Sequence, residues 1–419
     1  MSKDNKFLSN NKNENAFKKL IASNGSVSFM GTVISIIMGL LLGFILLLMF
    51  NAPFAVEGIT KILTAAFETP SEQSKLLYHA TPLIMVGLSV GFASKTGLFN
   101  IGAPGQYTVG GALGLIAAIQ LQLPWYVALL FAAVGGAVWG IFPGLFKALF
   151  NVNEVITSIM FNWIGLFAVN LAFSNMDKMV STYWGQPNKE KTPTLSLANE
   201  AGVIPEGPLA DYFWSDYTNI GIFIAIVIAI IIYIVLNKTT FGYELRACGL
   251  SQNAGIYAGI KAKRNMVLSM VIAGALAGIG GGLFYLSGVE QYTILKEVDG
   301  MGFNGIPVAL LAYNNPIGII FSSLFIGVIN VGGAKLQPEF AKELVDIIIA
   351  AIIYFSAFSL LVKQIIRKFL KADESNVNAE PASKDDENES EAEEAKTESD
   401  ADKEVDDKSE DESSKEVTE

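Results

Sequence analysis

Apolar runs alternate with short polar segments along most of this 419-residue chain. A helix needs about 20 predominantly apolar residues to cross the hydrocarbon core of a bilayer. We expect ten transmembrane helices, at 30–50, 77–95, 104–122, 124–146, 155–174, 218–237, 265–289, 302–313, 317–334 and 344–362. The run 302–313 is short and contains Pro307, so it predicts a half-length or partly re-entrant helix. The pattern indicates an all-α polytopic membrane protein.

One stretch between two of these runs combines residue types that fit neither a simple helix nor a simple loop. Residues 97–107 read Gly-Leu-Phe-Asn-Ile-Gly-Ala-Pro-Gly-Gln-Tyr, with glycines, a proline and two side-chain amides but no charge. Irregular backbone at membrane depth is tolerated only where it is buried in protein or lines a cavity. This stretch is therefore the first candidate for a transport pathway.

A partial copy of this pattern lies near the C-terminal end of the body. Residues 302–307 read Gly-Phe-Asn-Gly-Ile-Pro, against Phe-Asn-Ile-Gly-Ala-Pro at 99–104. Each copy begins a predicted span, and the two spans run in opposite directions. A five-plus-five inverted repeat, with broken helices that meet near the bilayer midplane, produces this relation. Chance similarity of so short a match is the alternative.

Neutral amides and aromatic rings surround the two predicted breaks, where helix N-termini favour electronegative ligand atoms. This chemistry suits an uncharged polar ligand that bears rings or hydroxyl groups. For each single aromatic ring, packing against lipid or another helix is the alternative. The candidate pathway residues are Phe99, Asn100, Gln106, Tyr107, Asn162, Trp163, Phe303 and Asn304.

Charge is segregated along the chain. Residues 372–419 carry 21 acidic side chains and five lysines, although the whole chain has a net charge of only −11. Such a segment cannot bury enough apolar surface to fold and predicts a disordered tail. Basic residues in alternate loops place both termini in the cytoplasm, with 1–29 as an N-terminal segment and 30–371 as the transmembrane domain. The loop 175–217 is then extracellular and predicts a structured cap, which would also suit docking of an extracellular partner.

Several function classes are disfavoured by what the spans lack. Proton-coupled carriers usually keep buried ionisable side chains in their spans, and the centres of the predicted spans have essentially none. A sodium-driven carrier that uses backbone carbonyl groups stays open. The chain has no P-loop motif, so energy for active transport would enter through another subunit. His79 is the one histidine and Cys248 the one cysteine, which disfavours a zinc site or a Ser-His-Asp triad.

The basic segment 238–264 connects two predicted spans on the cytoplasmic side. Ser251 suits the N-cap of a short helix that ends near Gly259. Small residues and a tyrosine on its surface would let another protein pack closely. An ordinary basic inner loop is the alternative.

Four landmarks, in order, carry a resemblance to a known family. They are Gly97–Gly102 with Gly105 and Gln106, Asn153–Ile156 leading to Asn162, Gly242–Gly249 with Ala254 and Tyr257–Ile260, and Gly302–Leu311 followed by Asn315–Gly318. Over roughly 30–365 the chain resembles the permease subunits of ABC importers for nucleosides and simple sugars. The Phe-Asn-Ile-Gly run favours the nucleoside branch. Pro104, Asn304 and Pro307 depart from the family's usual residues, which leaves the precise substrate open.

The resemblance implies a type II ABC-importer-like fold that works by alternating access in the bacterial plasma membrane. An extracellular substrate-binding lipoprotein delivers the substrate, and ATP with Mg²⁺ binds a separate cytoplasmic ABC ATPase. This chain is then a transport subunit without a bound cofactor or metal, in contact with membrane lipid but not nucleic acid. A second permease, either a relative or another copy, completes the assembly. The residues implied to couple to the ATPase are Gly242, Glu244, Arg246, Gly249, Ala254, Tyr257 and Gly259. A simple-sugar permease is the near alternative and a sodium-coupled secondary transporter the remote one.

Overall fold

A computed structural model gives the fold of the protein. It describes residues 24–355, apart from 184–185, 295, 338, 342, 345 and 352–353. The acidic tail 372–419 and most of the N-terminal segment 1–29 lie outside the described residues. The same is true of much of the predicted tenth span at 344–362.

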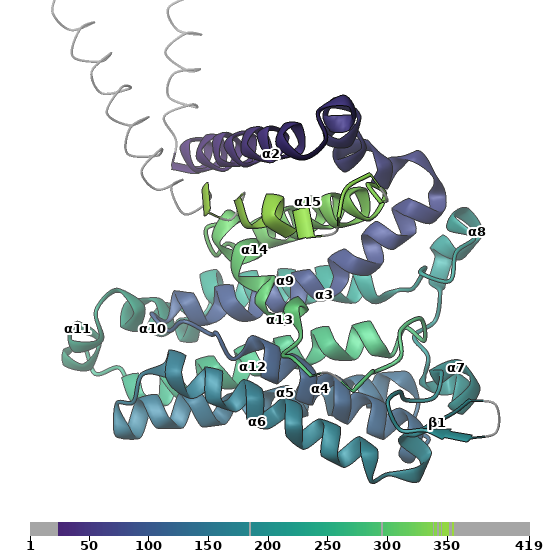
Figure 1. Cartoon of the computed structure of the whole chain (residues 1–419). Coiled ribbons are helices and arrows are strands. Elements are labelled where there is room, and N and C mark those ends of the chain that lie inside the picture. The colour runs from purple at the N-terminus through teal and green to yellow at the C-terminus, as the bar shows by residue number, and fades with distance from the viewer. Residues whose placement is uncertain are drawn as a thin grey trace, which may run out of the picture. The chain divides into compact units, whose positions relative to one another are not determined.

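The described residues are mostly helical, and seven of their helices are long and apolar enough to cross a membrane (Figure 1). These are α2 (Asn24–Glu68), α3 (Pro70–Lys95), α5 (Trp125–Phe150), α6 (Glu154–Ser174), α9 (Gly221–Lys238), α12 (Ala262–Tyr285) and α15 (Pro316–Ala334). The chain is therefore a multi-pass membrane protein, as its apolar runs predicted.

Two of the predicted spans are short or interrupted helices. The third is α4 (Ala103–Leu115), which runs directly into a π-helical turn, η1 (Ile116–Gln120). The eighth consists of α13 (Gly300–Phe303) and α14 (Gly305–Leu311), which together are too short to cross a bilayer. A count of ten helices and the inverted repeat therefore stay predictions.

The first helix is longer than its apolar run predicted. Helix α2 continues to Glu68, well beyond the expected end at Phe50. Non-helical backbone at Asn51 (φ −153°, ψ 79°) divides it, and Pro53 follows two residues later. Proline lacks a backbone N–H and its ring clashes with the carbonyl four residues earlier, which bends or breaks a helix. The polar and proline residues that end the apolar run thus mark a kink within the helix.

Short elements gather at the two opposite ends of the long helices (Figure 1). At one end lie α10 (Thr240–Leu250) and α11 (Gln252–Tyr257). The other end carries the segment 175–219, whose elements are η2 (Asp177–Met179), the antiparallel strands β1 (Ser181–Tyr183) and β2 (Gln186–Asn188), α7 (Leu195–Ala198), η3 (Glu200–Gly202), η4 (Gly207–Leu209) and α8 (Ala210–Phe213). Thr182 pairs with Pro187 in the centre of the two-stranded sheet.

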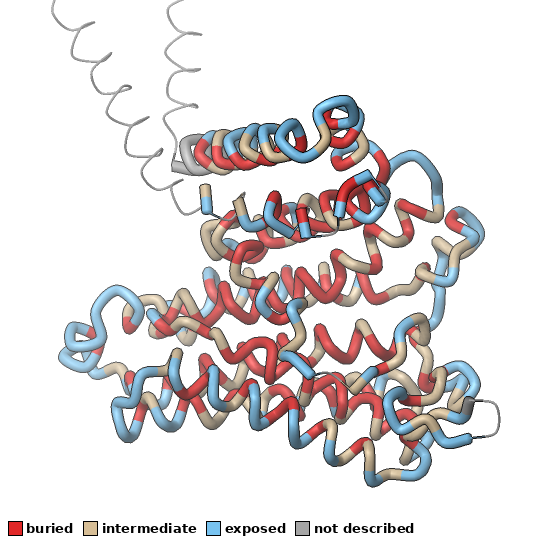
Figure 2. The backbone as a smooth tube through the Cα atoms, in the orientation of Figure 1, coloured by how far each residue is buried: buried red, intermediate tan, exposed pale blue. Residues whose placement is uncertain are grey.

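The centre of the protein is formed by α3, α4 and α12, whose buried residues contrast with the exposed ones along α2 and α6 (Figure 2). In the most apolar 18-residue stretch of α3, 89% of the residues are buried, against 22% in the corresponding stretch of α2. Helices α5 and α12 cross at glycines, because a Cβ on Gly136 would lie 2.7 Å from the Cα of Gly278. Small residues of this kind let helix backbones approach closely in membranes.

Candidate functional site

The chain between α3 and α4 is an irregular break that begins at a glycine turn. Helix α3 ends at Lys95, and Gly97 adopts a positive φ of 76°, which favours glycine. Residues up to Gly102 are non-helical before α4 starts, with Pro104 in its first turn. Proline is tolerated there because the first N–H groups of a helix have no intrahelical partner. The irregular backbone predicted for 97–107 is therefore present from Gly97 to Gly102, while α4 includes the rest.

A buried amide pair joins the two sides of this break. The Asn100 Nδ2 donates to Gln106 Oε1 at 2.8 Å, and the Gln106 Nε2 donates to Asn100 Oδ1 at 3.2 Å. Asn100 also donates to the Ser89 hydroxyl of α3 at 2.9 Å. Both amides are essentially inaccessible. Mutual pairing satisfies polar groups that would be costly to leave unpaired in a membrane.

Asn162 on α6 holds the backbone of the same break. Its Oδ1 accepts the Gly105 N–H at 2.9 Å, and its Nδ2 donates to the Ile101 carbonyl at 3.0 Å. The side chain is buried. Three candidate pathway residues, Asn100, Gln106 and Asn162, thus lie together, but their amide groups bond to one another or to the break.

The aromatic candidates have different surroundings. Tyr107 is fully buried against the rings of Phe284 and Tyr285, at centroid distances of 6.4 and 6.3 Å. Its hydroxyl has no hydrogen-bond partner among the described residues. Phe99 is half-buried at the break. Trp163 lies outside this cluster, because it is 41% exposed on α6 and stacks on Phe167.

The second predicted break lies directly against the first. Asp299 caps α13 by accepting the Met301 N–H at 2.9 Å. Gly302 packs so closely on the first turn of α4 that a Cβ there would lie 2.6 Å from the Pro104 nitrogen, and Figure 1 shows α13 beside α4. Next to this contact, Phe303 is 39% exposed and Asn304 is half-buried. The two similar stretches, far apart in the sequence, therefore meet through their backbones.

The segment 238–264 forms two helices where one was predicted. Ser251 caps α11 by accepting the Ala254 N–H at 3.3 Å, and Gly259 turns the chain with a φ of 81°. The predicted N-cap and helix end are confirmed. Helix α10 was not predicted, although Thr239, which accepts the Gly242 N–H at 3.1 Å, is a standard N-cap residue.

Helix α10 connects α9, α12 and the turn after α3. A Cβ on Gly242 would lie 2.5 Å from the Leu236 carbonyl oxygen of α9, so this tight turn requires glycine. Glu244 accepts the Asn265 Nδ2 of α12 at 2.9 Å. On the facing side, a Cβ on Gly249 would clash with the Lys95 carbonyl oxygen and lie 3.0 Å from the Gly97 nitrogen.

The remaining groups of this segment divide into exposed and buried ones. Tyr257 is 93% exposed and Leu250 90% exposed, and Ala254 is exposed beside them. Arg246 donates to the Gly242 carbonyl within its own helix at 3.4 Å. Cys248 is buried under Gly255, and burial raises the pKa of its thiol above the ordinary value. An uncharged surface that combines apolar and amide side chains thus faces outward from α11.

Comparison with known proteins places this architecture. The sequence pattern of the branched-chain amino acid transport system permease component matches residues 73–357, about two thirds of the chain. The chain belongs to this permease family. It is 35% identical to the guanosine ABC transporter permease protein NupP of Bacillus subtilis, over 81% of this chain and 96% of that protein. No solved structure matches.

Two further relatives show that permeases named for different substrates are similar to this chain. The permease is 34% identical to the nucleoside ABC transporter permease protein NupB of Lactococcus lactis, over 82% of this chain and 95% of that protein. It is 29% identical to the glucose ABC transporter permease protein TsgB13 of Haloferax volcanii, over 77% of this chain and 85% of that protein. The family is one of transport subunits, as the landmarks implied.

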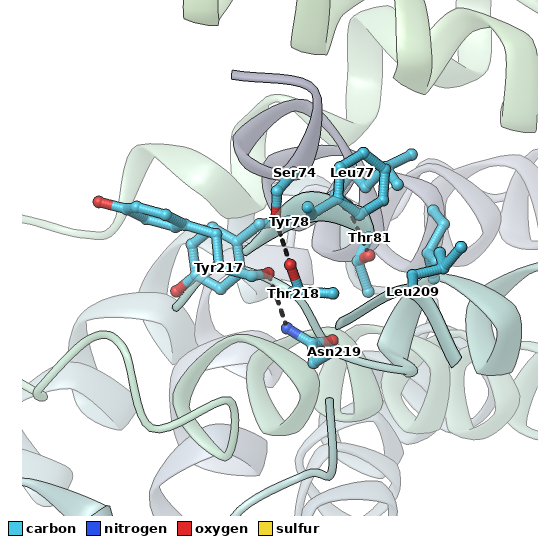
Figure 3. A pocket seen from close by; sticks show the side chains of 10 residues that line it. Ser74, Leu77, Tyr78, Thr81, Leu209, Tyr217, Thr218 and Asn219 are labelled. Atoms are coloured by element: carbon cyan, nitrogen blue, oxygen red, sulfur yellow. Dashed lines mark hydrogen bonds between the residues drawn. The ribbon is translucent and has the colours of Figure 1, made fainter. Parts of the chain in front are cut away.

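Two cavities of the permease were not indicated by its sequence. A small one, of about 10 Å³, lies between α3 and the segment before α9, where Ser74 and Thr218 share a hydrogen bond of 2.9 Å (Figure 3). This volume is about that of one water. A larger one, of about 610 Å³, opens between α2, α14 and α15 and includes Lys95 and Phe321 in its lining. Neither cavity is lined by a candidate pathway residue.

Proposed function

We propose that this chain is the membrane-spanning subunit of an ATP-driven ABC importer that carries nucleosides into the cell. One observation carries the proposal. The chain is 34–35% identical to permeases named for guanosine and for nucleosides, over at least 95% of the length of each. Because the similarity extends over nearly the whole length of each relative, it includes the regions that form the transport pathway and the contacts with partner subunits.

The two meeting breaks are the proposed place of the transport pathway. The candidate residues around the two breaks are all uncharged. Among them, Phe303, Asn304 and Phe99 have exposed surface. We assign substrate contact to these three, since an aromatic ring can stack on a nucleobase and an amide can bond to its edge. Asn100, Gln106 and Asn162 instead hold the pathway in shape. A second permease subunit completes the pathway on the face that exposes Phe303.

Energy enters this assembly through the α10–α11 segment. A cytoplasmic ATPase that binds ATP and Mg²⁺ docks on the exposed α11 surface around Tyr257, and Gly249 and Glu244 tie that surface to the membrane helices. In this orientation both chain termini are cytoplasmic. The segment 175–217 is then extracellular, where Trp214 is 88% exposed and available to a substrate-binding lipoprotein.

A simple sugar is the second candidate substrate, because the glucose permease TsgB13 is 29% identical to this chain. Uptake of labelled guanosine in cells that carry the whole importer, with unlabelled nucleosides or sugars as competitors, separates the two. We expect unlabelled nucleosides to abolish uptake and glucose or ribose to leave it unchanged. Uptake that sugars suppress, or that persists after the ATPase subunit is deleted, would contradict the proposal.

A further inference from the structure

The break before α4 is attached to the α10–α11 segment by a close backbone contact. Gly249, at the end of α10, lies on the turn from Lys95 to Gly97 with no room for a Cβ. That turn continues through Leu98 and Phe99 into the break itself. A displacement of α10 therefore reaches the break without an intervening side chain.

The break at α13 is attached by hydrogen bonds to the segment at the opposite end. The Thr192 N–H donates to the Tyr292 carbonyl at 2.9 Å, and the Tyr292 N–H donates to the Thr192 hydroxyl at 3.1 Å. Lys191 and Thr293 form a β-bridge beside this pair. The Tyr292 hydroxyl is also anchored, since it donates to Asn170 Oδ1 of α6 at 2.9 Å. The chain then leads from Tyr292 to Asp299, the N-cap of α13.

The two breaks complete the connection where Gly302 lies on Pro104. Side-chain contacts can absorb a displacement by changing rotamers, whereas backbone atoms in van der Waals contact cannot, because packed interiors are nearly incompressible. Two such contacts, at Gly249 and at Gly302, together with the hydrogen-bonded pair of Thr192 and Tyr292, therefore connect the segment 175–219 with α10 and α11 through the centre of the protein.

We propose that these contacts, Thr192 with Tyr292, Gly302 with Pro104 and Gly97 with Gly249, form one signalling path between the binding-protein side and the ATPase side. The path rests on the proposed function and adds the means by which loaded binding protein outside stimulates ATP hydrolysis inside. Rigid-body rocking of the helices without such a path is the competing mechanism.

The test uses the complete importer in lipid nanodiscs, with both permeases, the ATPase and guanosine-loaded binding protein. The measurement is ATP hydrolysis with and without loaded binding protein. In G302A the added Cβ displaces Pro104, whereas the control G300A, in the same short helix, places its Cβ in open space. G249A likewise displaces the Lys95–Gly97 turn, whereas the control G255A makes only an ordinary contact of 3.5 Å with the Cys248 sulfur.

We expect G302A to keep basal hydrolysis, and we expect both G302A and G249A to lose stimulation by about tenfold or more, within the range of typical couplings between sites. G300A and G255A should match the unmodified protein. Full stimulation of assembled G302A would overturn the path and favour rigid-body rocking.

A milder variant serves if G302A does not assemble. T192V removes one hydroxyl, and with it the bond from the Tyr292 N–H, but keeps the bond between the two backbones. Reduced stimulation with normal basal hydrolysis supports the path, and unchanged stimulation contradicts it. Tyr257→Asp separates the path from the proposed ATPase contact: if this variant hydrolyses ATP and transports guanosine normally, α11 is not the ATPase contact. Guanosine uptake that persists without the ATPase subunit is the outcome that would contradict the proposed function itself. If Tyr257→Asp is inactive while T192V and G302A are normal, only the path has failed.

Discussion

Replacing Asn162 with leucine is expected to destabilise the permease strongly, because the two residues have similar size but only asparagine can bond to the break. The substitution leaves the Gly105 N–H and the Ile101 carbonyl without their partner. Each buried backbone group left unpaired costs about 1–3 kcal/mol, so the expected loss is about 2–6 kcal/mol.

Hydrogen bonds between membrane helices are often weaker than this, about 0.6 kcal/mol on average, because helices separated in the membrane find other partners. The break is different, since its backbone has no helical partner to which it can return. We therefore expect Asn162→Leu to exceed that average clearly.

Equilibrium unfolding in mixed detergent–SDS micelles measures the free energy directly. Asn175→Leu is the matched control, because this exposed amide caps the end of the same helix by donating to Leu171 at 2.7 Å. Its loss should be about 0.5–1.5 kcal/mol, the net contribution of an ordinary hydrogen bond, because water can replace the bond at this exposed site. A loss below about 1 kcal/mol for Asn162→Leu, after correction by this control, would refute the assignment of Asn162 as the support of the break.

Three further outcomes are expected. Tyr257→Asp should abolish uptake by placing charge on the ATPase contact, and Gly249→Asp should abolish it by displacing the Lys95 turn. Membrane insertion, measured by fractionation, and affinity for binding protein, measured by titration, should not change. Normal uptake would exclude a coupling role. Deletion of 373–419 should leave guanosine uptake largely unchanged, whereas complete loss would show that the tail takes part in transport. Burial raises the pKa of the Cys248 thiol, so its thiolate fraction is small near pH 8 and grows as pH rises. Maleimide labelling of Cys248 should therefore be slow near pH 8 and accelerate with pH. Labelling as fast as that of a cysteine placed at Tyr257 would contradict the burial of Cys248.

Hydrophobic runs predicted seven helices that the structure shows to be long and apolar enough to cross a membrane, because length and apolarity are what a bilayer demands. They could not predict which side of a helix faces the protein. Helix α9 is apolar on all sides, and its sequence therefore carries little periodic signal. Trp163 and Asn162 are neighbours in α6, yet one is exposed and the other buried, and only the position of the break decides between them.

Local chemistry was predictive where a few adjacent residues determine the conformation. Ser251 was recognised as an N-cap because its hydroxyl needs only the next turn of its own helix. The contact of Gly302 with Pro104 was suggested by the repeated pattern, but its closeness depends on the packing of segments about 200 residues apart. The role of Asn162 was missed for the same reason, because nothing near it in sequence shows which backbone groups it bonds.

The glycine crossing of α5 and α12 also has a consequence for biogenesis. Helix α5 enters the membrane long before α12 is synthesised, so its glycine face around Gly136 and Gly140 meets lipid first. Lipid chains cannot fill that face as closely as the α12 backbone does, where Gly274 would place a Cβ 3.1 Å from the Gly140 Cα. The nascent chain therefore carries an incomplete interface until translation passes Tyr285. A chain truncated before that point keeps this face unmatched, which gives membrane quality control a way to distinguish it from the finished protein.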